Sequence, residues 1–166
     1  TTEVSTWSQY VKNAKAFNNE GSFCILDIGH RKTVAYFFYE KELKTYSLSY
    51  VAGHHVNEMI MTHYDVNQEK AVEFKHENAF FLLPEQYDEV DKKQKEFAVK
   101  MDDAFQPLIK DFKRWELSYR INHGHTLEKI YLTGGTSQTK NIENYLTSVL
   151  EKKVSFLDDF SRNFSS

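Results

Sequence analysis

Phe23-Cys24-Ile25-Leu26-Asp27-Ile28-Gly29-His30-Arg31-Lys32-Thr33 is the segment from which the organisation of this chain can be inferred. Its four leading apolar residues predict a strand buried on both faces, which ends at an acid, a glycine and a polar turn. Gly29 would let the backbone approach an anion, Thr33 offers a hydroxyl, and Asp27 could hold a metal-bound water or position a nucleophile. The alternative is a structural turn in which Asp27 caps local amides, because a strand followed by Asp-x-Gly also arises by chance.

Length and composition limit the classes of protein that the chain can represent. A chain of 166 residues with 40% hydrophobic and 27% charged residues fits one well-buried soluble domain. Its formal net charge of -3 disfavours binding to nucleic acid. The single cysteine, Cys24, lies in the predicted buried strand, which excludes an intramolecular disulfide and favours a reducing, cytoplasmic compartment. No segment predicts a membrane span or a signal peptide, so we expect any anchor of the parent protein to lie outside this sequence.

Hydrophobic spacing, turn residues and caps predict a series of helices and strands. In order, we expect an amphipathic helix within residues 1–20, strands at 23–26, 33–39 and 43–50, helices at 56–64 and 68–76, an irregular piece at 78–91, a long helix at 91–121, a strand at 129–132, a helix at 140–150, a strand at 153–157 and a polar tail at 158–166. Pro107 should kink or split the long helix. The strand at 43–50 alternates, so it should lie near a sheet edge. The predicted organisation is a lead-in over 1–20, a lobe over 21–157 with a short insertion at 78–91, and the tail.

Two further glycine turns lie between predicted elements, as Gly29 does. Val51-Ala52-Gly53-His54-His55-Val56 places Gly53 just before a helix. Ile130-Tyr131-Leu132-Thr133-Gly134-Gly135-Thr136-Ser137 is an apolar strand that ends in a glycine pair before the next helix. Three leading antiparallel strands followed by alternating helices and strands form the layout of a ribonuclease H-like lobe. The predicted fold class is therefore α/β, with a mixed five-stranded sheet and helices on both faces.

Residues 18–157 resemble the second lobe of an actin-like protein of the type found in PilM pilus-assembly proteins and in the cytoplasmic domain of the secretion protein GspL. The division protein FtsA is a more distant relative of the same kind. The resemblance is carried by the three glycine turns and by the helix Glu69-Lys70-Ala71-Val72-Glu73-Phe74-Lys75. It implies a nucleotide site, working or vestigial. The residues so implied are Asp27, Gly29, Thr33, Gly53, Lys75, Gly134 and Gly135.

The sequence departs from this pattern in ways that imply weak or absent nucleotide binding. In actin-like proteins each of two lobes supplies one phosphate loop, whereas this chain supplies only one such loop. His54 stands where a second glycine is usual, and Asn57 stands where threonine is frequent. The bulk of His54 would hinder a close approach of the backbone to a ligand. The resemblance thus implies no cofactor in the isolated domain, whereas a full-length protein could take up ATP and Mg²⁺.

The function that this resemblance implies is a scaffold at the cytoplasmic face of the bacterial inner membrane, in type IV pilus assembly or type II secretion. Its partners would be a membrane-embedded assembly protein and a motor ATPase. Four adjacent apolar residues are the candidate partner contact, because such a run rarely stays exposed without a partner. These residues are Phe80, Phe81, Leu82 and Leu83. The opposing hypothesis is an ATPase or small-molecule kinase, with Asp27 and Thr33 acting on phosphates through Mg²⁺ and with Lys75 and the glycine pair around the nucleoside.

Other residue patterns are better explained by structure than by chemistry. His54, His55 and His63 do not match H-E-x-x-H and have no carboxylate in a known ligand pattern, so we expect no metal site. No serine lies on a G-x-S-x-G elbow and Cys24 should be buried, so no catalytic nucleophile is predicted. A lysine late in a helix, such as Lys75, is usually solvated, and a glycine pair can serve a turn alone.

Overall fold

The structure, a computed structural model, describes residues 2–157. The α-helices are α1 (Thr2–Asn13), α2 (Gly53–Tyr64), α3 (Gln68–Asn78), α4 (Lys92–His123) and α5 (Ile142–Leu150). Short 3-10 helices are η1 (Lys15–Phe17), η2 (Pro84–Glu89) and η3 (Gly135–Gln138). The strands are β1 (Ser22–Ile28), β2 (Thr33–Tyr39), β3 (Glu42–Ser49), β4 (Lys129–Thr133) and β5 (Lys153–Phe156). The tail predicted at 158–166 lies outside the described residues.

The five strands form one mixed sheet in the order β3-β2-β1-β4-β5. β1 pairs antiparallel with β2, and β2 pairs antiparallel with β3. On its other edge β1 runs parallel to β4, which runs parallel to β5. The predicted sheet and the edge position of β3 are confirmed. β1 is the central strand and has neighbours on both edges, which explains why it reads as an unbroken apolar run.

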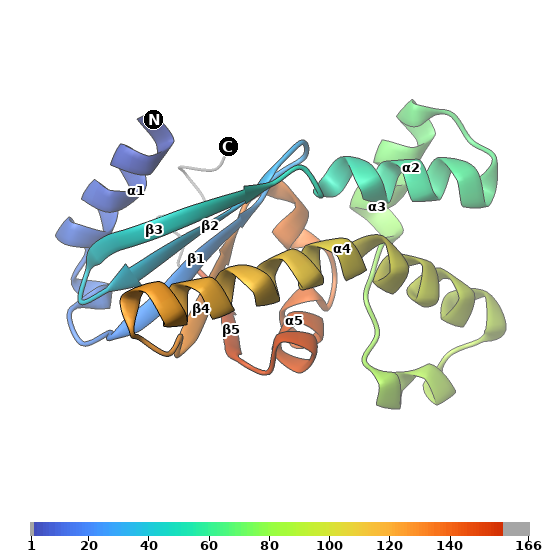
Figure 1. Cartoon of the computed structure of the whole chain (residues 1–166). Coiled ribbons are helices and arrows are strands. Elements are labelled where there is room, and N and C mark those ends of the chain that lie inside the picture. The colour runs from blue at the N-terminus through green and yellow to red at the C-terminus, as the bar shows by residue number, and fades with distance from the viewer. Residues whose placement is uncertain (1, 158–166) are drawn as a thin grey trace.

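Alternate side chains of β1 enter two separate hydrophobic cores. Phe23 and Ile25 point toward α1, where the ring of Phe17 stacks on that of Phe23 with centroids 4.8 Å apart. Leu26 and Ile28 point to the opposite face, which α4 and α5 cover. Figure 1 shows α1 and α4 placed around the sheet in this way. The period of two in the strand therefore links both layers through one element.

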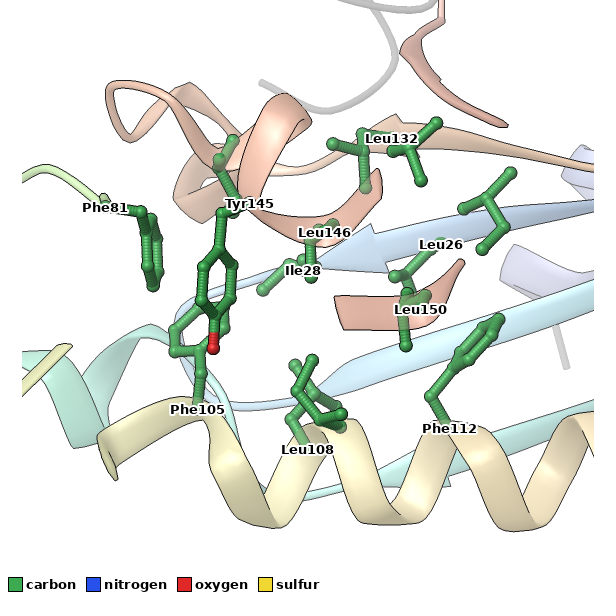
Figure 2. Close-up of a cluster of buried hydrophobic side chains, with 14 of the residues drawn as sticks. Leu26, Ile28, Phe81, Phe105, Leu108, Phe112, Leu132, Tyr145, Leu146 and Leu150 are labelled. Atoms are coloured by element: carbon green, nitrogen blue, oxygen red, sulfur yellow. The ribbon is translucent and has the colours of Figure 1, made fainter. Parts of the chain in front are cut away.

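The larger core fills the space between the sheet, α4 and α5 (Figure 2). Leu26 and Leu132 extend from β1 and β4 toward Leu146 and Leu150 of α5. The rings and branched chains that α4 adds are Phe105, Leu108 and Phe112. Each such side chain contributes about 1.5–3 kcal/mol when fully buried. This packing fixes the ends of β1 and β4, from which the site described below emerges.

α4 is a single helix of 32 residues that contains Pro107. Its N-cap Asp91 accepts from the N–H of Gln94 at 2.8 Å, and its C-cap is Gly124, with φ 74°. Of the two outcomes predicted for Pro107, a kink or a split, the structure shows the kink: α4 stays one helix, and its axis changes direction near its middle (Figure 1). A proline inside a helix removes one hydrogen bond and crowds the preceding turn, which bends the axis without ending the helix.

The segment after α3 is packed against the core. Phe81 is 1% exposed, and its ring centroid lies 4.8 Å from that of Phe105 and 4.4 Å from that of Tyr145. The Phe81 N–H donates to the carbonyl of Lys140 at 3.0 Å. The other three residues of the apolar run are half-buried: Phe80, Leu82 and Leu83. The expected four-residue contact surface is therefore wrong for Phe81, because its ring fills the gap between α4 and α5.

α2, α3 and the first half of α4 lie together beyond one end of the sheet (Figure 1). α3 begins at Asn67, whose side chain accepts from the N–H of Lys70 at 2.9 Å. Ala71 of α3 is fully buried, so this helix packs closely on its neighbours. None of the helices over residues 2–157 combines the length and apolarity that crossing a membrane requires.

Candidate functional site

The three glycine turns meet at one rim, where β1 and β4 end. The carbonyl of Gly29 accepts from the N–H of Gly53 and from the hydroxyl of Thr136, each at 3.0 Å. A Cβ on Gly134 would lie 2.5 Å from Asp27 Oδ1 and 2.5 Å from the carbonyl oxygen of Ile28. We call Gly29, Gly53, Gly134 and the side chains that touch them the glycine rim. The ends of parallel strands are the usual place for a ligand in α/β sheets.

Gly53 lies in a space that leaves no room for a side chain. A Cβ there would be 2.3 Å from Thr136 Oγ1, 3.1 Å from Lys75 Nζ and 3.3 Å from the carbonyl oxygen of Gly29. The Lys75 ammonium therefore reaches the rim from α3, and within residues 2–157 it forms no ion pair. Desolvation by burial lowers the pKa of Lys75. A partly buried lysine without a carboxylate suits an anionic ligand.

Further basic side chains lie near Lys75. The rings of His30 and His54 have centroids 6.1 Å apart, and their residues lie on the two sides of the Gly29–Gly53 junction. The pKa of His30 is lowered by desolvation first, and then by Lys75, Arg31 and His54. Lys75 and Arg31 therefore place positive charge on this side of the rim, whereas the lowered pKa of His30 favours its neutral form.

Asp27 lies at the rim on the α1 side of the sheet. Its pKa is raised to about 6 by desolvation and by Glu3, against the opposing effect of Lys32. Lys32 and Glu3 form an ion pair at 3.1 Å between the β1–β2 turn and α1. Asp27 is thus close to Gly134, and its carboxyl is partly protonated in mildly acidic solution.

Thr33 does not face the rim. Its side chain is fully buried and its hydroxyl donates to the carbonyl of Val51 at 2.8 Å. The expectation that this hydroxyl contacts a phosphate or Mg²⁺ is wrong, because it instead holds the chain that leads from β3 into α2. Gly135 is exposed, and a Cβ on it would meet no atom within 4 Å. Gly134 therefore contacts the rim, and Gly135 faces open space.

The first backbone amides of α2 are already hydrogen-bonded within the protein. Gly53 and His54 donate to the carbonyls of Gly29 and His30 at 3.0 Å and 2.8 Å, and His55 donates to the Ala52 carbonyl at 3.0 Å. The ring Nδ1 of His54 also lies 2.9 Å from the His30 carbonyl oxygen. Free amides at a helix N-terminus are ordinarily what binds a phosphate. Here these donors serve the fold.

Two residues of the site were not among those that the sequence predicted. Thr136 joins Gly29 to η3, and its only signal in the sequence is its place after the glycine pair. Asn57 is 3% exposed, and neither polar atom of its side chain has a partner in the described structure. It follows Gly53 by four residues in α2, so both lie on one face of the helix. An unpaired buried amide of this kind indicates a site for water or a ligand.

The residues present fit an anionic group better than a metal-bound one. Lys75 and the unpaired Asn57 amide suit a phosphate, whereas the position beside Gly53 is already filled by Thr136 and Lys75. A divalent cation would depend on the carboxylate of Asp27, but burial disfavours the charged form of this group. The hydroxyl of Thr33 is turned away from the rim. Over residues 2–157 no three side chains of His, Cys, Asp or Glu group as metal ligands would.

Comparison with solved structures shows an actin-like fold. A PilM-PilN type IV pilus biogenesis complex matches with TM-score 0.74 and 18% identity, over 95% of this chain and 42% of that one. MreB5 of Spiroplasma citri, solved with ADP, matches with TM-score 0.69 and 15% identity, over 96% and 55%. The ethanolamine utilization protein EutJ from Carboxydothermus hydrogenoformans matches with TM-score 0.56 and 17% identity, over 83% and 45%. The chain thus spans about half the length of these proteins.

Comparison of sequences gives the family. No curated protein matches the chain. The family described as Type IV pilus assembly protein PilM matches residues 4–165. Together with the five-stranded sheet and the glycine rim, this match shows that the chain belongs to the PilM family of type IV pilus assembly proteins.

Proposed function

We propose that this lobe is part of an actin-like scaffold that docks protein partners during type IV pilus assembly, with weak or absent nucleotide binding. Family membership over residues 4–165 supports the pilus system over the secretion alternative. The PilM-PilN complex among the structural neighbours supports a pilus-assembly protein as partner. We place the scaffold at the cytoplasmic face of the bacterial inner membrane, between a membrane-embedded assembly protein and a motor ATPase.

The proposal of weak nucleotide binding rests on the first backbone amides of α2, which are already hydrogen-bonded within the protein. The amide N–H groups of Gly53 and His54 donate to the carbonyls of Gly29 and His30. A phosphate would have to compete with these bonds, each of which contributes about 0.5–1.5 kcal/mol. The buried hydroxyl of Thr33 removes one more ligand for a metal-bound phosphate. Rigid packing and a partly closed phosphate turn favour a docking role over turnover.

The experiment measures nucleotide and partner binding in the same full-length protein. Calorimetric titration with Mg²⁺-ATP and Mg²⁺-ADP is compared with titration of the cytoplasmic segment of the membrane-embedded pilus partner. We expect the partner to bind without nucleotide, and its Kd to change by less than about threefold when nucleotide is added. Steady ATP turnover, or partner binding that requires ATP, would contradict the scaffold proposal.

The alternative function is an ATP-binding lobe of an active actin-like ATPase. Lys75 favours it, because a half-buried ammonium without a carboxylate is costly unless an anion arrives. On this alternative, Lys75→Met in the full-length protein abolishes ADP binding and also weakens the partner interaction. On the scaffold proposal, the same substitution leaves partner affinity unchanged. The two functions are therefore separated by one variant.

A further inference from the structure

A pocket lined by aromatic rings lies between the end of α2, α3 and the first turns of α4. It has a volume of about 370 Å³. Phe97 forms a buried part of its wall at 2% exposure, and Tyr64 stands at its edge at 43% exposure. The ring centroids of Phe74 and Phe80 lie 5.5 Å and 5.2 Å from that of Phe97. We call this feature the aromatic pocket.

The charge around the aromatic pocket has one sign. Lys93 at the start of α4 and Lys140 before α5 line it, and both are exposed. Neither forms an ion pair in the described part of the chain. No acidic side chain is among the described residues that line the pocket. A wider groove between α2 and α4 differs, because Glu58 and Asp103 line it together with Lys100.

The walls of the aromatic pocket are held in place from two distant parts of the sequence. Phe80 forms a parallel bridge with Lys140, and the N–H of Phe81 donates to the Lys140 carbonyl at 3.0 Å. Asn141 donates from its side chain to the Phe81 carbonyl at 2.9 Å. The lysine that gives the pocket its charge is thus fixed beside the rings. A preformed site costs less ordering on binding.

We infer that the aromatic pocket binds an acidic segment of a protein partner through an apolar anchor residue. The rings supply an apolar surface for a leucine or phenylalanine side chain, and the two lysines supply partners for flanking carboxylates. The inference rests on the proposed scaffold function and names the chemistry of one docking surface. It uses none of Gly29, Gly53 and Gly134, because Phe74 and Lys75 leave α3 in different directions.

The experiment titrates a fluorescein-labelled peptide, Glu-Asp-Leu-Phe-Asp-Glu, with the full-length protein and follows fluorescence anisotropy. We expect saturation below about 1 mM and a loss of at least about tenfold in affinity for a peptide with lysines in place of the acids. A peptide with serines in place of Leu-Phe should lose affinity similarly. Failure of the acidic peptide to bind, or equal binding by the control peptides, would overturn the inference.

Variants then assign the binding to the pocket. The double variant Lys93→Glu and Lys140→Glu should weaken the acidic peptide at least about tenfold. The matched control is Lys110→Glu with Lys113→Glu, which reverses two exposed lysines further along α4 and should leave affinity unchanged. Equal effects of the two double variants would refute a pocket-specific site.

The membrane-partner titration separates the two proposals. If the partner binds and the variants at Lys93 and Lys140 do not affect either ligand, the pocket inference fails while the scaffold stands. If no partner binds the unaltered protein, the scaffold proposal itself fails.

Discussion

Replacing Gly53 with alanine should destabilise the protein through one identifiable neighbour. The new Cβ would lie 2.3 Å from Thr136 Oγ1, whereas an ordinary contact begins at 3.4 Å, so the hydroxyl must move by about one ångström. Moving it breaks the 3.0 Å bond to the Gly29 carbonyl. The lost bond costs about 1 kcal/mol and overpacking costs about 1–3 kcal/mol, offset by up to about 1 kcal/mol from removing glycine. The net cost is about 2 kcal/mol.

A double-mutant cycle tests this origin. Thr136→Ala alone should cost about 1–2 kcal/mol, through the hydrogen bond and one buried methyl group. In the Gly53→Ala background the same change also removes the collision. The double variant should therefore cost no more than Thr136→Ala alone, which gives a coupling energy of about 2 kcal/mol.

The assay is urea unfolding followed by circular dichroism, with free energies compared at equal m values. Gly135→Ala is the matched control, because a Cβ there meets nothing within 4 Å. It should change stability by less than about 0.5 kcal/mol. If the costs of the two single substitutions add up to the cost of the double variant within about 0.5 kcal/mol, the contact between Gly53 and Thr136 is refuted.

Three further predictions concern neighbouring residues. Gly134→Ala should cost about 2–4 kcal/mol of stability, because φ is +94° and the new Cβ would meet the Ile28 carbonyl. Gly124→Ala should cost about 1–2 kcal/mol, because φ is +74° but the space around it is open. Equal costs of the two substitutions in urea unfolding would contradict this prediction. Asp27→Asn should raise stability by up to about 3 kcal/mol at about pH 8 and change it little at about pH 4. The reason is that folding raises the pKa of Asp27 from 3.8 to about 6. The stability that this gives is present below pH 3.8 and is lost as the pH rises through about 6. A pH series that is unchanged in the variant would show that Asp27 does not titrate in this way. Lys75→Met should raise the urea midpoint at neutral pH, because the lowered pKa of Lys75 shows that folding disfavours its charged form. A lower midpoint would indicate that the ammonium stabilises the fold.

The sheet and the glycine rim could be predicted because their signals are local. The apolar run at 23–26 indicated β1, and the alternation at 43–50 identified the edge strand β3. A glycine between two predicted elements marks a turn, which is why Gly29, Gly53 and Gly134 were found. The resemblance to actin-like lobes implied that these turns belong to one site, and the contacts among them bring them to one rim.

The direction of individual side chains could not be predicted, because it depends on residues distant in the sequence. Thr33 has the right type and spacing for a phosphate ligand, yet its hydroxyl bonds to Val51 once α2 is in place. Phe81 reads as an exposed apolar residue until Tyr145 of α5 packs on its ring. Thr136 lies 107 residues from Gly29, and no local pattern links the two.

The central place of β1 has a consequence for how the molecule opens. Its amides are bonded to β2 on one edge and to β4 on the other, and its side chains alternate between the layer under α1 and the layer under α4 and α5. Neither layer can therefore melt while the other survives, since both would lose the same strand. Hydrogen exchange at the amides of Cys24 and Leu26 should occur only through global unfolding, and the lobe behaves as one cooperative unit.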